Sequence, residues 1–391
     1  MNFDFSEEQT MLRDSVARFV QDDYNFDTRR AIVASEEGIS RQNWQTFAEL
    51  GWLSVPFAEE HGGFGGGPVD LMVMMEEFGK GLVVEPYFAT VVLFGGLLRA
   101  AGNEAQQAQY IPSIIDGSTL GAFAYLERQS RYEITDVATR AVADGDGYVL
   151  NGEKVAVANG ANADVLIVSA RSSGDQYDSR GISLFVVPAD ADGVERVSYR
   201  MMDGQVVANV VLKDVRVAAD ALLGELGGGF AAIERVTDEA LVALGAEALG
   251  LMGQLNAKTL EYAKTREQFG VAIGSFQALQ HRMVDTFMSY EQAKSMVYRA
   301  VCALENSDDD ARRIVHAMKV MIEKSGQHIL EEAIQLHGGM GLTDELDIGH
   351  FAKRLMMINA TLGDGDYHQA AFSALSYGGD ASAEARISDA A

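Results

Sequence analysis

The sequence has little of three things that mark secreted, nucleic-acid-binding and membrane-spanning proteins. Among 391 residues there is one cysteine, Cys302, which excludes an internal disulfide framework and fits a reducing compartment. Basic residues are outnumbered, with 31 lysines and arginines against 57 acids, and the formal net charge is −26. Because a phosphate backbone would be repelled, no nucleic-acid partner is expected. Such acidity is typical of a highly soluble protein or of a salt-adapted host.

Targeting and membrane signals are also missing from the sequence pattern. The opening "MNFDFSEEQTMLRD" has no basic n-region and no long apolar run, so we expect no secretion signal. We find no run of the roughly 18 apolar residues that a bilayer requires. We therefore expect a cytoplasmic protein with no membrane partner. Apolar residues make up 48% and charged residues 23% of the chain, which is long enough for two or three globular domains.

The first part of the chain, residues 1–120, has helical periodicity. The first helix is expected to begin after Ser6, a good N-cap residue followed by acids. The glycine cluster "EHGGFGGGPVD" lies between two helical patterns. Since it lacks the strand-then-helix context of a dinucleotide fingerprint, we interpret it as a loop and an N-cap.

The secondary-structure pattern of the sequence changes twice after residue 120. Residues 121–225 contain short β-rich runs separated by Asp-Gly and Asn-Gly turns, which predicts a small antiparallel β domain. Helical periodicity returns over residues 226–376 and is typical of an antiparallel bundle. Residues 377–391 are small and polar, and we expect a flexible tail. The predicted fold class is α+β.

Three segments have the composition of a ligand site. "TREQFG" places the planar cation of Arg266 beside an aromatic residue and a glycine, and a guanidinium suits phosphate. "SFQALQHRMVD" is expected to begin a helix with Ser275 as N-cap, and free N–H groups there suit an anion. "AIQLHGGMGLTDE" ends a helix at Gly338 and Gly339, a usual cap that also lets a flat ligand approach the backbone.

Taken together and in order, these segments resemble the acyl-CoA dehydrogenase family over nearly the whole chain. "YVLNGEKVAVANGANAD" resembles the strand pair beside the flavin, and "TREQFG…FQALQHRMVD" and "QLHGGMG" resemble two signature segments. "LERQSRYEITDVATRA" and "LGDGDYH" are similar to the subgroup that contains the pimeloyl-CoA dehydrogenase small subunit and steroid side-chain dehydrogenases. The resemblance implies an N-terminal helical domain, a middle antiparallel β domain and a C-terminal helical bundle.

The resemblance also implies a cofactor, a reaction and partners. Such proteins bind FAD at a subunit interface, usually in tetramers, and convert an acyl-CoA to the trans-2-enoyl-CoA. A carboxylate removes the α-proton while the β-hydride moves to the flavin, and hydrogen bonds polarise the thioester carbonyl. An electron-transfer flavoprotein then reoxidises the cofactor. The implied assembly is a homotetramer, or a heterotetramer with a homologous subunit.

Matching residues assign the FAD contacts. Arg266, Gln268 and Phe269 would contact the diphosphate and nearby groups from a neighbouring subunit. The other implied contacts are Ile273, Phe276 and Leu279 on the adenosine side, Gln335, Gly338 and Gly339 at the diphosphate across the interface, and the segments around Tyr125, Leu126, Ala156 and Ala158 against the isoalloxazine. For each apolar member taken alone, a place in the bundle core is the better explanation, and only the joint order of the motifs favours a cofactor contact.

Several positions depart from the family pattern. Ala156 and Ala158 stand where the family has a Trp that packs on the flavin and a Thr that bonds near N5. Leu241 stands where relatives have an arginine, and "LERQSRYEITD" replaces the usual "TEPxxGSD". These changes predict a looser flavin contact or one made by other residues.

The catalytic base is the most important departure. The family glutamate belongs to a Glu-Gly-Thr turn, which here is Leu362-Gly363-Asp364. Some relatives place the glutamate on the first long bundle helix, where this chain has Ala240. Glu247 lies two turns further on the same face, in an apolar run that would raise its pKa and suit a base. It is equally explained as a carboxylate paired with an arginine of a neighbouring chain.

Other acidic residues have alternative explanations. Asp364 is the second candidate base, although it could instead hold the flavin ribityl chain or an N–H group. Glu239 lies about 100° from the face of the relatives' site, and we interpret it as a solvated charge. The alternation of Asp364, Asp366 and His368 lacks the closing bidentate acid of a calcium loop, so no metal is expected. Asp366 is instead predicted to cap the final helix.

Two functions follow from these observations. The first is an active acyl-CoA dehydrogenase that uses Glu247 or Asp364 as base. The second is a non-catalytic partner subunit in a mixed tetramer, which the missing Glu, Trp and Thr favour. A flavin-less scaffold is less consistent with the retained Arg266 and Phe269. Loss of the Trp predicts a roomier pocket, and the subgroup indicates dicarboxylic or steroid-type CoA esters.

Overall fold

The computed structural model describes residues 5–378, and residue contacts divide the chain into two compact units. The first unit contains Met1–Arg29, Gly67–Val83 and Leu241–Ala391, and the second contains Arg30–Gly66 and Val84–Ala240. The units therefore group two N-terminal helices with the C-terminal helices. The division of the sequence at residues 120 and 225 stays a prediction. The end of the predicted tail, residues 379–391, lies outside the described residues.

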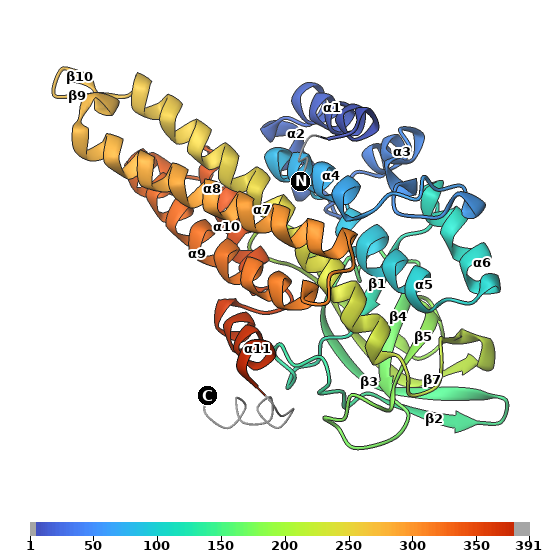
Figure 1. Cartoon of the computed structure of the whole chain (residues 1–391). Coiled ribbons are helices and arrows are strands. Elements are labelled where there is room, and N and C mark those ends of the chain that lie inside the picture. The colour runs from blue at the N-terminus through green and yellow to red at the C-terminus, as the bar shows by residue number, and fades with distance from the viewer. Residues whose placement is uncertain (1–4, 379–391) are drawn as a thin grey trace. The chain divides into compact units, whose positions relative to one another are not determined.

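Long helices build the first unit (Figure 1). Their bounds are α1 Glu7–Asp22, α4 Pro68–Gly81, α7 Phe230–Thr265, α8 Gln277–Glu305, α9 Ala311–His337, α10 Ile348–Ala360 and α11 Gly365–Tyr377. Helix α9 packs against α8, α10 and α11, and α4 packs against α1 and α8. The first turns of α7 belong to the second unit.

Local sequence sets several of these helix ends. Ser6 is the N-cap of α1, with a capping box to Gln9, as predicted. The glycine cluster forms a loop that ends at Gly67, the N-cap of α4. A Cβ on Gly79 would overlap the Glu247 carbonyl, and one on Gly250 would overlap the Glu76 carbonyl. Because only glycine fits at these positions, the backbones of α4 and α7 lie in direct contact. This contact fixes the position of Glu247 relative to α4.

The second unit combines short helices with one sheet. The helices are α2 Phe26–Ala34, which begins in the first unit, α3 Arg41–Glu49, the 3₁₀ helices η1 Trp52–Ser54, η2 Glu59–His61 and η4 Ala219–Ala221, the π-helix η3 Phe88–Phe94, α5 Gly95–Ala101 and α6 Glu104–Ile115. The strands are β1 Gly121–Ala124, β2 Arg140–Asp144, β3 Gly147–Ala158, β4 Val165–Arg171, β5 Ile182–Pro188, β6 Val194–Arg200, β7 Val206–Ala218 and β8 Leu222–Leu223.

Most strand pairs of the sheet are antiparallel, as predicted, but two pairings are parallel and were not expected. Its strand order is β6-β7-β3-β2-β4-β5-β8, with β1 added on β4. Strand β1 pairs with β4 in parallel, and so does β2 through Arg140 and Arg171. The Asp-Gly signal predicts the β2–β3 hairpin correctly, but Asn151-Gly152 lies at an irregularity inside β3 and not at a turn between strands. The parallel pairings form between segments that no short turn joins. Buried Leu150, Leu166, Phe185 and Val210 lie in the core of this sheet.

Helix α7 is long and apolar enough over an 18-residue window to cross a membrane, by length and composition alone. The reason is its run of Ala, Leu, Gly and Val with few charges. Of that window, 78% is buried inside the protein, and a core helix meets the same criterion.

Candidate active site

A buried ion pair holds the segment predicted to border the isoalloxazine. Lys154 has no exposed surface, and its Nζ lies 2.7 Å from Oε1 of Glu127 and 3.0 Å from Oγ of Ser169. Burial alone would raise the pKa of Glu127, but the charge and hydrogen bond of Lys154 outweigh it and lower that pKa to about 2. Burial lowers the pKa of Lys154 to about 8 against the attraction of Glu127. Both groups are therefore charged at neutral pH.

The same pair anchors the loop that follows β1. Glu127 also accepts the backbone N–H groups of Ala138 and Thr139, at 2.8 and 3.0 Å. Lys154 donates to the carbonyl of Tyr125 at 3.2 Å, and Leu126 accepts the N–H of Val155 at 2.8 Å. The segments predicted around Leu126 and Ala156 are thus brought together by the chain itself.

Tyr125 is half-buried, in contrast to the buried Glu127 and Lys154. Its ring stacks on Phe123 with centroids 4.9 Å apart and an interplanar angle of 24°. Burial raises the pKa of the Tyr125 phenol well above its usual value, so the hydroxyl stays protonated. A protonated phenol is a hydrogen-bond donor.

Ala156 and Ala158 lie at a β-bulge. The register of β3 against β7 shifts between Lys154 and Val157, and Ala156 has a φ of 49° with its N–H on Oδ1 of Asn209 at 3.1 Å. Bulges and positive φ at a non-glycine residue are enriched at functional sites. Nearby, Asn159 has a φ of 56°, and its buried Nδ2 has no hydrogen-bond partner among the described residues. The small alanines and this free donor fit a flat polar ligand such as an isoalloxazine.

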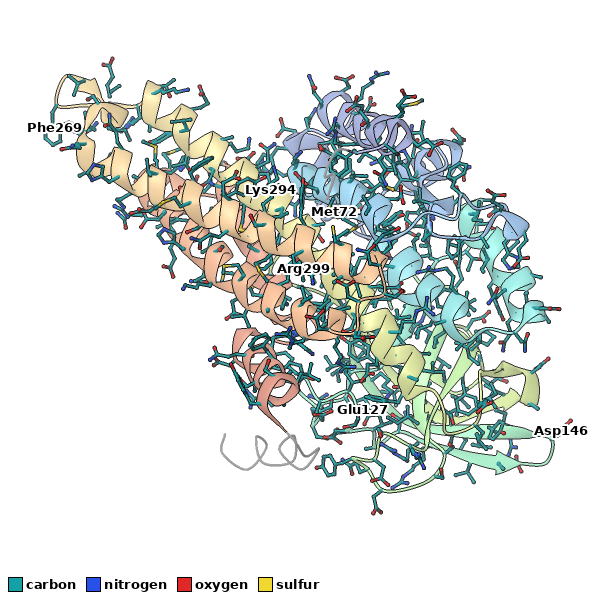
Figure 2. All side chains as sticks on the ribbon, viewed as in Figure 1. Met72, Glu127, Asp146, Phe269, Lys294 and Arg299 are labelled. Carbon is teal, nitrogen blue, oxygen red and sulfur yellow. The ribbon has the colours of Figure 1, made fainter. Side chains whose placement is uncertain are left out.

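The second set of predicted residues lies on the connection between α7 and α8. Strands β9 Glu267–Gln268 and β10 Val271–Ala272 pair around Phe269 and Gly270, whose φ values of 56° and 81° are those of a type I′ turn. Phe269 is 93% exposed and lies at the far end of this hairpin (Figure 2). Its ring meets that of Phe276 edge to face at 6.2 Å. The turn therefore presents an aromatic side chain with almost no cover from its own chain.

Arg266 and Gln268, on the same hairpin as Phe269, are also exposed and could contact a ligand. The Arg266 side chain is exposed and forms no hydrogen bond or ion pair with a described residue, and Gln268 is exposed beside it. Ile273 and Leu279 are half-buried. Ser275 is not the N-cap of α8, as was predicted, because a 3₁₀ turn over Ile273–Ser275 moves the cap to Phe276.

Gly338 and Gly339 form the predicted helix end. Gly338 is the C-cap of α9 with a φ of 61°, and Gln335 is exposed in the last turn of that helix. A Cβ added at Gly338 or at Gly339 would meet no atom within 4 Å. Gly339 has no positive φ, so neither conformation nor packing in this chain requires a glycine there. A free guanidinium and an open glycine backbone fit the diphosphate of FAD.

Glu247, the first candidate base, is buried and paired. On α7 it is 5% exposed, and its carboxylate accepts from Arg354 of α10 in a bidentate pair, 2.6 Å from Nε and 2.8 Å from Nη2. The sequence alternative assumed an arginine of a neighbouring chain, whereas Arg354 belongs to this chain, 107 positions away. No local pattern connects the two residues, so sequence reasoning missed this partner.

Asp364, the second candidate, caps a helix. Its Oδ1 accepts the N–H of Tyr367 at 2.9 Å and makes it the N-cap of α11. The prediction that Asp366 is the cap is therefore wrong, because the helix begins at Gly365. Leu362, in the place of the family glutamate, is 9% exposed with a φ of 59°.

Two acids near Ala240 differ from expectation. Glu239 is not a solvated charge, because it pairs with Arg99 at 2.8 Å and with Arg235 at 3.4 Å. Asp238 was missed by sequence reasoning, and its side chain forms no hydrogen bond or ion pair with another described residue. Burial, with a further contribution from the charge of Glu239, raises the pKa of Asp238 to about 7. Its position two residues before Ala240 was the available signal.

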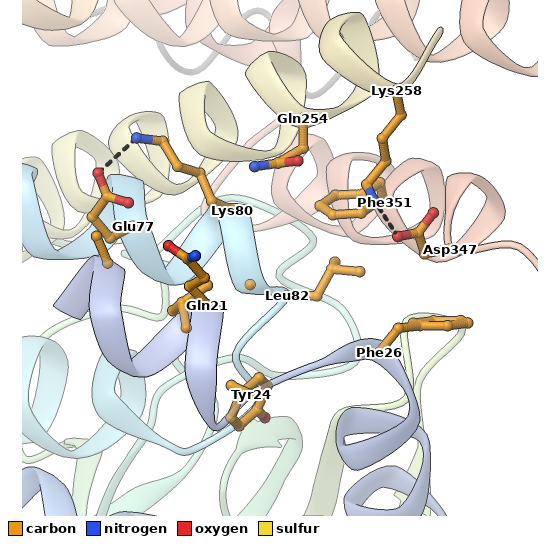
Figure 3. Close-up of a pocket in the computed structure, with 13 residues that line it drawn as sticks. Gln21, Tyr24, Phe26, Glu77, Lys80, Leu82, Gln254, Lys258, Asp347 and Phe351 are labelled. Atoms are coloured by element: carbon orange, nitrogen blue, oxygen red, sulfur yellow. Dashed lines mark hydrogen bonds and ion pairs between the residues drawn. The ribbon is translucent and has the colours of Figure 1, made fainter. Parts of the chain in front are cut away.

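One cavity of about 390 Å³ lies within the first unit and is separate from these residues (Figure 3). Its two lysines are neutralised, because Lys80 pairs with Glu77 at 2.6 Å and Lys258 pairs with Asp347 at 2.8 Å. None of the predicted site residues lines it. It therefore has no free positive charge for a phosphate. Within residues 5–378, no group of three potential metal ligands is present.

Comparison with known proteins agrees with this arrangement. Family models described as acyl-CoA dehydrogenase N-terminal, middle and C-terminal domains match residues 6–118, 122–215 and 227–371. A curated relative, the probable acyl-CoA dehydrogenase YngJ of Bacillus subtilis, is 31% identical over 89% of this chain and 92% of its own length.

Solved structures give the same result. The Tcur3481-Tcur3483 steroid ACAD is 28% identical, with a TM-score of 0.85 over 98% of this chain and 99% of that chain. The FAD complex of PigA is 26% identical, with a TM-score of 0.88 over 95% and 98% of the two chains. The protein therefore belongs to the acyl-CoA dehydrogenase family of FAD-dependent enzymes.

Proposed function

We propose that this chain oxidises an acyl-CoA thioester to the 2-enoyl-CoA within a tetramer and passes the electrons to an electron-transfer flavoprotein. The observation that carries the proposal is the hairpin of Arg266 and Phe269, whose side chains have almost no contact in their own chain. The 93% exposed Phe269 lies among other exposed apolar side chains, and such a group supports an interface with a partner. The cytoplasm is the expected compartment.

Bound FAD would supply the hydride acceptor. Arg266 would donate hydrogen bonds to its diphosphate, and the bare backbone at Gly339 would allow close approach. Tyr125 and Leu126 on one side and Ala156 and Ala158 on the other would border the ring. Because the Glu127–Lys154 pair fixes both segments, this border keeps its shape before the cofactor arrives.

A second subunit would cover the exposed face of the α7–α8 hairpin. Exposed apolar residues gather there at Leu260, Phe269, Val271, Phe276, Val284, Phe287 and Met288. Several large apolar side chains at one end of a helical pair are typical of an interface between subunits. A homotetramer and a heterotetramer with a homologous chain both satisfy this surface.

Glu247 remains our first candidate for the base that takes the α-proton. Its carboxylate is desolvated, and the bidentate Arg354 pair holds it in one orientation. Oriented carboxylates make efficient bases, whereas the two hydrogen bonds from Arg354 already occupy both oxygens of this one. Asp364 is the second candidate, with one oxygen used in its helix cap.

Single substitutions separate the candidates. Glu247→Gln and Asp364→Asn change a charge at nearly constant shape, and Asp238→Asn tests the remaining free carboxylate near Ala240. Loss of about 10³-fold or more in turnover, with FAD content unchanged, identifies the base, since general-base catalysis contributes about 10²–10⁴-fold. Retained turnover in Glu247→Gln would reject Glu247.

A second candidate function is a partner subunit without a base. It is favoured because the carboxylates of both Glu247 and Asp364 are already occupied by donors of this chain. In that case all three substitutions leave the activity of the mixed assembly unchanged. Loss of activity on replacing Arg266 would still be expected, because that residue would serve the neighbour's FAD.

For the substrate we propose a bulky CoA ester of steroid or dicarboxylic type. Support comes from the small Ala156 and Ala158, and from the similarity to a protein described as a steroid ACAD. A panel of short-chain, dicarboxylic and steroid CoA esters tests this point. A clear preference for the short-chain ester would contradict it.

A further inference from the structure

The loop that ends α10, Thr361–Asp364, has an unusual backbone. Leu362 has a φ of 59° and Gly363 a φ of 116°, so two successive residues have positive φ. A leucine in the left-handed region is strained and persists only where surrounding contacts enforce it. The contacts that do so come from beneath the loop.

Lys319 of α9 is the first of these contacts. It has no exposed surface, and its Nζ donates to the carbonyls of Ile358 at 2.6 Å, Thr361 at 2.9 Å and Gly363 at 3.0 Å. A fourth carbonyl, of Asn359, lies 3.2 Å away. Carbonyls at a helix end have no partner within the helix. One buried lysine therefore closes the end of α10 and holds the loop to α9.

A pair of histidines makes the second contact. Nε2 of His368 lies 3.0 Å from the carbonyl oxygen of Leu362, and Nδ1 of His368 lies 2.7 Å from Nδ1 of His316. Because a carbonyl only accepts, Nε2 of His368 carries the proton, and in the neutral ring Nδ1 then accepts. His316 must donate from its own Nδ1. The relay runs from His316 through His368 to the positive-φ leucine.

The surroundings keep this relay neutral. The charged and titratable groups that face it are Arg312, Lys319 and Glu323 of α9, Asp364 of the loop and Tyr367 of α11. Burial, with repulsion from Arg312, lowers the pKa of His316 to about 4. Burial, with repulsion from His316 and Lys319, lowers the pKa of His368 to about 3. Glu323 accepts the N–H of Gly365 and fixes the start of α11.

We propose that Lys319, His316 and His368 are positioning residues that fix the segment Leu362–Asp364 from beneath. The inference rests on the proposed function in one respect, that this loop borders the acyl-CoA site. A misplacement of about 1 Å at an active-site element costs up to about 10²-fold in rate. The cluster thus controls catalysis without touching the substrate.

The test compares His368→Phe, which removes the donor to Leu362, with His368→Gln, whose amide can replace it without titrating. The readouts are hydrogen exchange of the amides of Gly365 and Tyr367 at pH 7, and kcat and KM for a turned-over CoA ester. His328→Gln, on α9 with His316 but outside the cluster, is the control.

We expect His368→Phe to raise exchange at these amides by at least about 10-fold and to lower kcat by about 10–100-fold, with KM within about threefold. His368→Gln should restore both values to within about threefold of the parent. If His368→Phe does not fold, His316→Phe, which breaks only the relay, should shift both readouts in the same direction by less.

Unchanged exchange in the folded Phe variants would overturn the proposal. The exchange readout does not require turnover, so it decides the matter even if this chain proves to be a non-catalytic subunit. Raised exchange with an unchanged kcat in an active assembly would show that the cluster holds the loop but does not influence catalysis. That result would overturn the catalytic role of the cluster and would not contradict the proposed FAD-dependent activity.

Discussion

Two regions of the molecule are predicted to bind the same cofactor, and their surroundings are opposite. The ring-side segments around Tyr125 and Ala156 are tied together by the buried Glu127–Lys154 pair. The hairpin that carries Arg266 and Phe269 has its backbone set by a local turn, while the side chains reach outward. The ring-side segments are held by contacts within the chain. The side chains of Arg266 and Phe269 have almost no contact with the described residues of their own chain.

The difference teaches how to interpret exposure in this protein. A buried charged pair costs desolvation and is retained where geometry matters, as at the ring-side segments. Phe269 and Arg266 make few side-chain contacts with the described residues, so they are expected to contribute little to the stability of the isolated subunit. The hairpin residues are therefore expected to act on a ligand and a neighbouring subunit, and substitutions in the two regions should have different consequences.

The largest effect is expected at the buried pair. Lys154→Met leaves the Glu127 carboxylate buried without its cation, and should lower the free energy of unfolding by about 3–5 kcal/mol. Urea denaturation measures the change. Lys213→Met removes a lysine from an exposed pair with Glu195 and should change stability by at most about 1 kcal/mol. Equal stability of the two variants would contradict the comparison.

The hairpin should show the reverse pattern. Arg266→Ala should leave the free energy of unfolding of the isolated subunit within about 0.5 kcal/mol of the parent. Loss of charge-assisted hydrogen bonds to the diphosphate, about 1.5–3 kcal/mol, should weaken FAD binding by about 10–100-fold. Flavin content after dialysis and native mass are the measurements, with Arg180→Ala, an exposed arginine of the second unit, as control. An FAD affinity like that of the parent would remove the hairpin from the site.

A pH titration extends the comparison to a buried site in the same unit as the hairpin. His316 and His368 have folded pKa values of about 4 and about 3, below the ordinary 6.5 of the unfolded chain. Between pH 6.5 and about 4 the unfolded state binds protons that the native state does not, so stability falls as pH falls.

The expected slope is at most about 1.4 kcal/mol per pH unit for each histidine. Urea denaturation at a series of pH values checks it. His368→Gln should reduce the slope relative to the parent, whereas His328→Gln should not. Parallel curves for the parent and His368→Gln would show that the folded histidine titrates normally.

The smallest effect concerns the bulge at the ring-side segments. Ala156→Gly relieves the cost of a positive φ but adds entropy to the unfolded chain, so stability should rise by at most about 1 kcal/mol. Thermal unfolding measures it, and Ala158→Gly, without a positive φ, should be destabilising. A loss of stability in Ala156→Gly would show that the bulge carries no strain.

Local patterns predicted much of the fold. Ser6, the glycine loop before α4, the β2–β3 hairpin and the end of α9 at Gly338 were found because each depends on a few neighbouring residues. The prediction that Ser275 is the N-cap of α8 was wrong, because a 3₁₀ turn precedes the helix and Phe276 is the N-cap. The parallel pairing of β1 with β4 was missed because no short turn encodes it.

In the candidate site, too, features set by neighbouring residues could be predicted, whereas contacts between residues distant in sequence could not. The segment Thr265–Gly270 was singled out because it places Arg266 beside Phe269 and a glycine, but the β-hairpin on which they lie was not predicted. The partner of Glu247 could not be predicted, because Arg354 lies 107 positions away and charge patterns identify neighbours only within a helix. The His316–His368 contact, 52 positions apart, was hidden for the same reason.

The most direct test of the central claim is the visible spectrum of the purified chain before and after anaerobic addition of the CoA esters. The account predicts a bound-flavin spectrum that bleaches with at least one bulky ester. A colourless protein, or a flavin that no ester reduces even after co-expression with a homologous subunit, would contradict it.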